Sequence, residues 1–218
     1  MTIAADPGRL FTERNDAYVR FIRFVRYPQG LRAFFRASPL LRSGLRVLDA
    51  GCGTGVVTLA LRDALESRAL APRVLHGFDL TPAMLDRFRA TLARRAIDDV
   101  DLVQANVLDL ESLPASWTGY DLIVTASMLE YVPRPRFVDA LRGLRRLLAG
   151  DGSLLLFMTR RNLLTRVLIG RWWESNLYGA EELRHAFRRA GLSAFAFRSF
   201  PPRARYLAVW GYIVEAQR

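Results

Sequence analysis

The sequence predicts an α/β fold in which a doubly wound, mostly parallel sheet of seven strands has helices on both faces and follows a helical extension. Three observations predict it. Apolar runs of strand length alternate with segments of helical periodicity, and the first of these runs ends in a glycine-rich turn. The 218 residues, 51% of them hydrophobic, suit one domain with a substantial core. We expect an N-terminal extension or lid over 1–43 and the main domain over 44–218.

Each predicted strand is a short and nearly continuous apolar run. Such runs are typical of parallel strands that are buried on both faces of a sheet. Their succession after residue 44, with a helical segment between most of them, favours a single doubly wound unit. The strands are expected at 45–50, 73–79, 100–106, 120–126, 153–159, 192–200 and 205–216.

Helical patterns fill the intervals between these runs. Thr81 is placed to cap a helix that has Pro82 in its first turn, a favoured arrangement. Residues 9–37 predict one or two helices broken near the sequence YPQG, because proline lacks an amide donor and glycine frees the backbone. The segment 160–178 interrupts the alternation and is interpreted as an insertion. Helices of the main domain are expected at 54–68, 81–96, 134–149 and 180–190.

The net charge of +11 is concentrated at the two ends of the chain. Residues 1–45 contain eight arginines and three acids, and residues 151–218 contain eleven arginines and five acids. The middle of the chain, 46–150, has thirteen of each and is neutral. Lysine is absent, which indicates codon bias, but codon bias does not explain why the excess lies at the ends. The ends are therefore expected to meet something anionic.

Several classes of protein are disfavoured. No apolar run approaches the roughly 20 residues that a membrane span needs, and the start of the chain lacks the pattern of a secretion signal. Cys52 is the only cysteine, which excludes an internal disulfide and a multi-cysteine metal site. His76 and His185 are too far apart to give a metal-ligand pattern. We expect a cytoplasmic protein with no metal.

The glycine-rich turn after the first strand predicts a ligand site. Asp49 ends the apolar run, and Gly51, Gly53 and Gly55 follow at every second position. Glycines permit a sharp turn and close approach of a ligand to the main chain, and the helix behind them offers free amides. The G-x-G-x-x-G pattern of dinucleotide sites is absent, because position 56 is valine. An acid here would repel a pyrophosphate but suits a ligand with an ammonium group.

Two further polar residues end the next strands. Asp79 follows the second strand, where an acid can accept both hydroxyls of a ribose, and Leu80 and Met84 beside it can face a flat base. Asn106 ends the third strand, where its amide can read the edge of adenine. Each residue alone has an ordinary alternative as a helix cap or a tight connection. Together, on successive strands, they outline S-adenosylmethionine.

Five segments carry a resemblance to a known family: VLDAGCGTG, FDLTPAML, VQANVLDL, YDLIVTASMLEYVP and LRRLLAGDGSLLL. In this order and spacing, over about residues 44–160, they resemble the class I S-adenosylmethionine-dependent methyltransferases. Within that class the chain is most similar to the small-molecule branch, which includes enzymes of quinone and natural-product biosynthesis. The resemblance implies a Rossmann-like sheet and the cofactor S-adenosylmethionine, with S-adenosylhomocysteine as the product.

The resemblance also implies roles for individual residues. Aspartate is usual in the family at the position of Asn106, which can still accept from the adenine amine. The methionine part of the cofactor would lie on the turn, the ribose on the second strand, the adenine between two strand ends and the sulfonium beside the fourth strand. The residues implied are Asp49, Gly51, Gly53 and Gly55 for methionine, Asp79 for ribose, Leu80, Asn106 and Val107 for adenine, and Thr125 and Ala126 for the sulfonium.

The methyl acceptor is expected to be a small, apolar or lipid-like molecule. Methyltransferases that act on exocyclic nucleic-acid amines usually have an Asn/Asp-Pro-Pro-aromatic turn after the fourth strand, whereas this chain has TASMLE. Nucleic acid is therefore disfavoured despite the charge. Glu130, Tyr131 and Tyr178 are candidates for a general base, although alignment of an activated donor can suffice. Candidates for the acceptor pocket are Tyr18, Met128, Tyr131, Trp172 and Tyr178.

The basic, aromatic segments 18–36 and 162–178 are interpreted as the acceptor pocket and its lid. Peripheral contact with an anionic membrane also fits them, as do ordinary amphipathic helices whose arginines extend into water. Two other functions stay open at this point. One is a methyltransferase that acts on RNA or protein, and the other is a non-catalytic module that binds S-adenosylmethionine.

Overall fold

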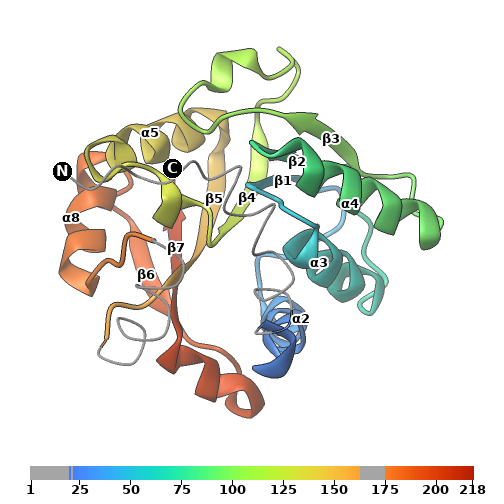
Figure 1. The fold of residues 1–218 in the computed structure, drawn as a ribbon, viewed down its shortest axis with the longest axis horizontal. Helices are drawn as coiled ribbons and strands as arrows, with labels where there is room; N and C mark the ends of the chain where they lie inside the picture. Colours follow the sequence, from blue (N-terminus) through green and yellow to red (C-terminus); the bar gives the residue numbers. More distant parts are fainter. Residues whose placement is uncertain (1–19, 21, 163–174) are drawn as a thin grey trace.

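The computed structural model describes residues 20, 22–162 and 175–218, whose strands form one seven-stranded sheet in the order β3-β2-β1-β4-β5-β7-β6 (Figure 1). The pairs that join β3, β2, β1, β4 and β5 are parallel, and β7 is antiparallel to both β5 and β6. The order confirms the predicted doubly wound fold. The strands are β1 (Arg46–Ala50), β2 (Val74–Asp79), β3 (Asp101–Gln104), β4 (Tyr120–Ala126), β5 (Leu148–Thr159), β6 (Phe195–Arg198) and β7 (Gly211–Gln217).

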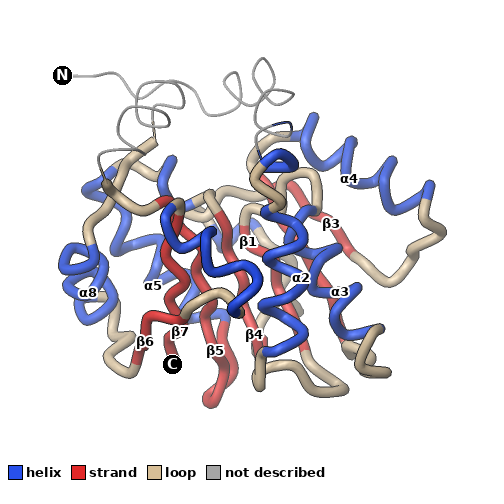
Figure 2. Tube along the Cα trace, turned by 90° about the horizontal axis from the view of Figure 1, so that it is seen from below, coloured by secondary structure: helices blue, strands red, loops and turns tan. Residues whose placement is uncertain are grey.

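Helices cover both faces of the sheet (Figures 1 and 2). One face is covered by α2, α3 and α4, and the other by α5 and α8. No described helix is long and apolar enough to cross a membrane. The helices are α2 (Tyr27–Ala37), α3 (Val56–Glu66), α4 (Pro82–Arg94), α5 (Phe137–Leu147) and α8 (Ala180–Arg189), and a 3-10 helix, η5, spans Pro202–Val209.

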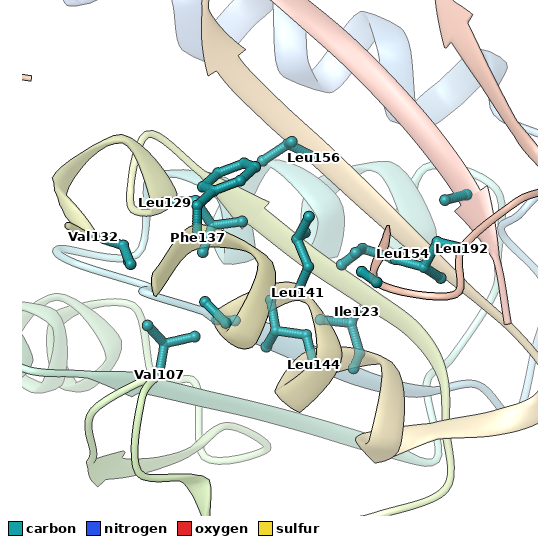
Figure 3. Packing of buried hydrophobic residues seen from close by; sticks show 14 of the residues in the cluster. Val107, Ile123, Leu129, Val132, Phe137, Leu141, Leu144, Leu154, Leu156 and Leu192 are labelled. Atoms are coloured by element: carbon teal, nitrogen blue, oxygen red, sulfur yellow. The ribbon is translucent and has the colours of Figure 1, made fainter. Parts of the chain in front are cut away.

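On the α5 side of the sheet, every second residue of a strand packs against the apolar face of α5. Leu141 and Leu144 of α5 lie against Ile123 of β4 and Leu154 of β5, and all four are completely buried (Figure 3). Alternation places the residues between them, such as Val124, on the opposite face. Burial on both faces is why these strands are continuous apolar runs in the sequence.

Helix α2 belongs to the second core, although it lies in the expected N-terminal extension. Leu31 and Phe35 of α2 are completely buried, and Phe34 and Phe35 meet the ring of Phe157 on β5 edge to face, at centroid distances of 5.4 and 5.9 Å. The break expected near YPQG is present, because Arg26 has a φ of 54° and the helix starts at Tyr27 with Pro28 in its first turn. This part of the extension is therefore packed like the rest of the domain.

The chain between β6 and β7 differs from the expectation. We expected one strand over 205–216, but the first part of that run is η5 and only Gly211–Gln217 forms a strand. Pro202 occupies the first position of η5, where its missing amide breaks no helical hydrogen bond, so the chain already enters a 3-10 helix before the apolar run begins. The apolar side chains of η5 instead pack on α2, where Leu207 lies directly against Gly30.

Candidate cofactor and acceptor site

A cavity of about 390 Å³ lies at the carboxyl ends of β1, β2 and β4. The order of the strands reverses between β1 and β4, and open α/β sheets bind ligands at such a switch point. Four stretches that follow strands line the cavity, and Tyr27 of α2 joins them: the stretches are the glycine turn with the start of α3, the end of β2 with the start of α4, residues 105–108 and residues 126–133. The sequence predicted a ligand site at this edge.

The glycine turn is held in a conformation that other residues adopt poorly. Gly51 and Gly55 have φ values of 75° and 84°, in the left-handed region. A Cβ atom at Gly51 would collide with Met128, and one at Gly55 would collide with the ring of Phe88 on α4. Glycine at these two positions therefore lets the turn pack against the loop after β4 and against α4.

Asp79 holds the turn and faces the cavity. Its Oδ2 accepts the Gly53 amide at 2.9 Å, and its Oδ1 accepts the Thr81 amide at 2.9 Å. Burial raises the pKa of Asp79, and these two hydrogen bonds act in the opposite direction. Carboxylate oxygens at the end of β2 are suitable acceptors for the two hydroxyls of a ribose.

Asp49 lies behind the turn and does not line the cavity. It is 2% exposed, and its Oδ2 accepts the Thr58 hydroxyl at 2.5 Å. Its Oδ1 is buried without a hydrogen-bond partner among the described residues. Burial raises the pKa of Asp49 to about 7. A buried carboxylate with an unused oxygen suits a nearby cation, such as the ammonium group of a methionine.

The adenine end is built from the residues after β2 and β3. Asn106 and Val107 line the cavity, and Asn106 Oδ1 accepts the amide of Leu108 at 2.9 Å, which fixes the side chain. Leu80 is 44% exposed at the cavity rim, and Met84 lines the same wall. A flat base between these apolar side chains, with its edge toward Asn106, fits the arrangement.

The residues expected beside the sulfonium occupy different positions. Ala126 lines the cavity, whereas Thr125 is completely buried beneath it, with no hydrogen-bond partner for its hydroxyl in the described chain. Ser127 follows with a φ of 54°, unusual for a residue with a side chain, and donates its amide to Phe157 at 3.0 Å. Strain of this kind is often found at functional sites.

The acceptor-pocket candidates divide into three groups. Met128 and Tyr131 line the cavity. Tyr178 lines neither cavity described here: its ring stacks on Phe137 at 4.5 Å and lies below the guanidinium of Arg134 at 4.6 Å. Tyr18 and Trp172 lie outside the described residues.

A second, smaller cavity of about 70 Å³ adjoins the first. Tyr27, Ser127 and Tyr131 line both cavities. Most of the other lining residues are apolar or aromatic, and they come from segments far apart in the chain: Ile22, Val25, Phe157, Met158, Phe200, Leu207, Trp210 and Tyr212. A hydrophobic group that enters this cavity would lie next to the ligand in the larger one.

Glu130 supplies a carboxyl group to the second cavity. The residue is 3% exposed, and its oxygens accept the amide and the hydroxyl of Thr159 on β5, each at 3.2 Å. Burial raises the pKa of Glu130, while the hydrogen bonds from Thr159 and Ser127 oppose that change. Glu130 therefore anchors the loop after β4 to β5 and places a polar group in an otherwise apolar wall.

The sequence did not identify Tyr27, Trp210 and Tyr212 as parts of the site. Tyr27 stands at the break before Pro28, where a helix begins at the cavity mouth. That break was recognised, and it was the one available signal that Tyr27 faces the site. Trp210 and Tyr212 were assigned to a continuous strand, and that pattern gives no indication that they turn toward a cavity.

These features of the fold and the site define a class of protein. A doubly wound α/β domain with a D-x-G-x-G-x-G turn, a ribose-type acid on β2 and an adenine-type amide after β3 is the architecture of a class I S-adenosylmethionine-dependent methyltransferase. Asp49 Oδ1, which has no hydrogen-bond partner among the described residues, is suited to the ammonium group of that cofactor, and Asp79 at the cavity wall is suited to its ribose.

Comparisons with known proteins agree with this class. Residues 47–152 match a family described as a methyltransferase domain. The chain is 32% identical over 120 residues to a ubiquinone biosynthesis O-methyltransferase of Xanthomonas oryzae pv. oryzae, which covers 55% of this chain and 45% of that protein. It is 31% identical over 144 residues to a malonyl-[acyl-carrier protein] O-methyltransferase of Hahella chejuensis, with 65% and 44% covered. The chain thus spans less than half of these relatives.

Solved structures show the same fold. The magnesium protoporphyrin IX methyltransferase of Synechocystis, determined with bound S-adenosylhomocysteine, superposes with a TM-score of 0.65 at 20% identity and covers 89% of this chain and 83% of its own. Residues 47–152 therefore form a methyltransferase domain, and the chain has the fold of solved S-adenosylmethionine-dependent methyltransferases.

Proposed function

We propose that this protein transfers a methyl group from S-adenosylmethionine to a small, apolar or lipid-like acceptor. One observation carries the proposal: the apolar second cavity joins the cofactor cavity at Tyr27, Ser127 and Tyr131. An acceptor whose reactive end passes this junction would meet the cofactor beside Ala126. The curated relatives named above include methyltransferases of a quinone pathway and of an acyl carrier protein.

In this proposal the larger cavity binds the cofactor through the residues implied by the sequence. Gly51 and Gly53 offer backbone to the methionine part, with the buried charge of Asp49 behind them, and Asp79 accepts from the ribose. Leu80, Asn106 and Val107 form the adenine end. When bound, the cofactor supplies a methyl group already activated on a sulfonium.

The chain's own contribution is alignment and exclusion of water. Holding two reactants in a productive geometry can lower a barrier by roughly 7–11 kcal/mol in favourable cases. The left-handed Ser127 and the anchor from Glu130 to Thr159 fix the loop that separates the two cavities. Ile22, Val25 and Tyr27 bring the N-terminal extension to the second cavity, which supports a role as a lid. Glu130 is placed to accept a hydrogen bond from a hydroxyl or amine on the acceptor.

The proposal is tested with labelled S-adenosylmethionine and fractionated cell extract. We expect label in the fraction of small apolar molecules. A substitution that fills the second cavity, Val25→Phe, should abolish that label and leave S-adenosylhomocysteine affinity within roughly twofold, because Val25 lines only the second cavity. Val209→Phe is the matched control, because it adds the same bulk at an exposed position that lines neither cavity.

Each alternative has its own outcome in this experiment. Label in RNA or protein would replace the small-molecule acceptor with a macromolecular one. Cofactor binding with no label in any fraction would leave a non-catalytic binding module. Full transfer by a folded Val25→Phe variant would show that the acceptor does not use the second cavity.

A further inference from the structure

Two segments from opposite ends of the chain form one surface beside the second cavity. The described residues 20 and 22–26 lie next to η5, and the Tyr206 hydroxyl donates to the carbonyl of Val25 at 3.0 Å (Figures 1 and 2). Leu207 of η5 also packs on Gly30 of α2, the helix that follows the first segment. We call the exposed side of 20, 22–26 and 202–210 the basic aromatic surface.

Large apolar side chains project from this surface into solvent. Phe24 is 86% exposed, Tyr206 is 47% exposed and Val209 is 48% exposed. Among the described residues the remaining exposed large hydrophobic side chain is Leu80, which belongs to the cofactor cavity. Exposed apolar groups that gather in one place mark a site of contact.

Arginines surround these apolar groups. The exposed ones are Arg20, Arg23, Arg26, Arg203 and Arg205. None of the five forms an ion pair with a described residue, and the sequence has no acid in 20–43 or in 199–214. Elsewhere the described arginines are commonly paired, as Arg62 is with Asp99 and Arg198 is with Glu215. Within the part of the chain that the structure describes, the surface therefore presents positive charge that no acidic side chain pairs with.

The same two segments face the second cavity with their other side. Ile22 and Val25 of the first segment and Leu207 and Trp210 of the second line its wall. A molecule bound on the basic aromatic surface would thus be separated from the cavity by the thickness of these segments. This placement links the surface to the acceptor pocket and not to the cofactor.

We propose that the basic aromatic surface docks on an anionic phospholipid bilayer and that an acceptor dissolved in the bilayer enters the second cavity from there. Guanidinium groups bind headgroup phosphates, and Phe24, Tyr206 and Val209 insert between them, as in peripheral anchors. An acidic protein would satisfy the arginines but gives no reason for single apolar side chains that protrude. The route of the acceptor rests on the proposed function, whereas docking rests on the surface alone.

Vesicle sedimentation tests docking in the absence of cofactor and acceptor. The full chain should sediment with phosphatidylcholine–phosphatidylglycerol vesicles at low salt, stay in solution with phosphatidylcholine vesicles, and be released as salt rises. Arg203→Gln/Arg205→Gln should weaken binding roughly 25-fold, about fivefold for each arginine. Phe24→Ser should weaken it roughly tenfold through lost insertion.

A matched control removes the same charge from the other end of the strands. Arg73 precedes β2 and Arg146 is near the end of α5, and both are exposed. Arg73→Gln/Arg146→Gln should change binding by less than about twofold if the surface, and not the net charge, is responsible. Equal losses in the two double variants would overturn the proposal.

Other outcomes separate this proposal from the proposed function. No binding to anionic vesicles at low salt would overturn docking, even if label is transferred to a soluble acceptor. Binding to polyglutamate with the same arginine dependence, and none to vesicles, would assign the surface to an acidic protein instead. Every variant should bind S-adenosylhomocysteine like the parent, since none of the residues changed lines the cofactor cavity.

Discussion

The two cavities of this protein share a wall but are built in different ways. Apart from Tyr27 of α2, the cofactor cavity is formed by short stretches that each follow a strand of one sheet, so its polar groups are positioned by the strand hydrogen bonds and by turns a few residues long. The second cavity is formed by segments near residues 22–27, 127–131, 157–159 and 200–212. It exists because a helix and a 3-10 helix pack on each other. The first cavity depends on local sequence, and the second depends on tertiary packing.

The largest effect that would test this contrast comes from Phe34→Ala. The Phe34 ring meets Phe157 at 5.4 Å and Phe200 at 6.2 Å, and both partners line the second cavity. The free energy of unfolding should fall by about 3–5 kcal/mol, as for other buried aromatic truncations. S-Adenosylhomocysteine affinity of the folded protein should stay within roughly twofold. Urea denaturation and calorimetry measure the two quantities.

Phe88→Ala is the matched control for this prediction. Phe88 is completely buried on α4 and packs directly against Gly55 of the glycine turn. It should cost a similar free energy of unfolding and should also weaken cofactor binding, because the turn loses its support. If Phe34→Ala weakened cofactor binding as much as Phe88→Ala, the two cavities would be one packing unit and the contrast would be wrong.

Asp79→Ala should give the largest effect on cofactor affinity. The variant removes the acceptor for a ribose and also the acceptor for the amides of Gly53 and Thr81. Hydrogen bonds to charged groups contribute about 1.5–3 kcal/mol, so affinity for S-adenosylhomocysteine should fall roughly 10- to 150-fold. Asp86→Ala removes an exposed carboxylate from α4 and should leave calorimetric affinity unchanged. An unaltered affinity in Asp79→Ala would remove this residue from the site.

The contrast also explains how much the sequence could predict. Asp79, Asn106 and the three glycines stand at fixed offsets from apolar runs, and the structure brings all but Gly55 to the cavity wall. Gly55 serves the site indirectly, through its contact with Phe88. The positions of Tyr27 and Trp210 depend on how α2 and η5 pack, and no local pattern carries that information. Pro202, at the first position of η5, was a local signal that a helix could start before the last apolar run.

A smaller effect is expected in the pH dependence of cofactor binding. Burial raises the pKa of Asp49 to about 7, so the free protein carries a partly protonated carboxyl group near neutral pH. A bound ammonium group would stabilise the carboxylate and lower that pKa, so binding should release protons. Affinity for S-adenosylhomocysteine should therefore rise by up to about tenfold per pH unit below pH 7 and level off above it.

Calorimetry in buffers of different ionisation enthalpy measures this proton release directly. In Asp49→Asn the release near pH 7 should vanish and the affinity should become flat with pH. A raised pKa also means that the fold favours the protonated acid, so the free protein should lose stability as pH rises from about 4 to about 7. If S-adenosylhomocysteine affinity depended on pH in the same way in Asp49→Asn and in the parent, Asp49 would not interact with the ammonium group of the ligand.

The smallest effect is expected for Asn106→Asp, which restores the residue usual in the family. Asn106 Oδ1 accepts the Leu108 amide at 2.9 Å, and a carboxylate oxygen can accept the same bond. A second oxygen remains for the adenine amine, so affinity for S-adenosylhomocysteine should hold or rise, within about threefold.

A second measurement uses the deaminated analogue of S-adenosylhomocysteine, in which a keto oxygen replaces the adenine amine. Asparagine can turn its amide nitrogen to that oxygen, whereas an ionised carboxylate offers no donor. The variant should therefore discriminate against the analogue more strongly than the parent does. A large loss of S-adenosylhomocysteine affinity in folded Asn106→Asp would mean that the base lies elsewhere in the cavity.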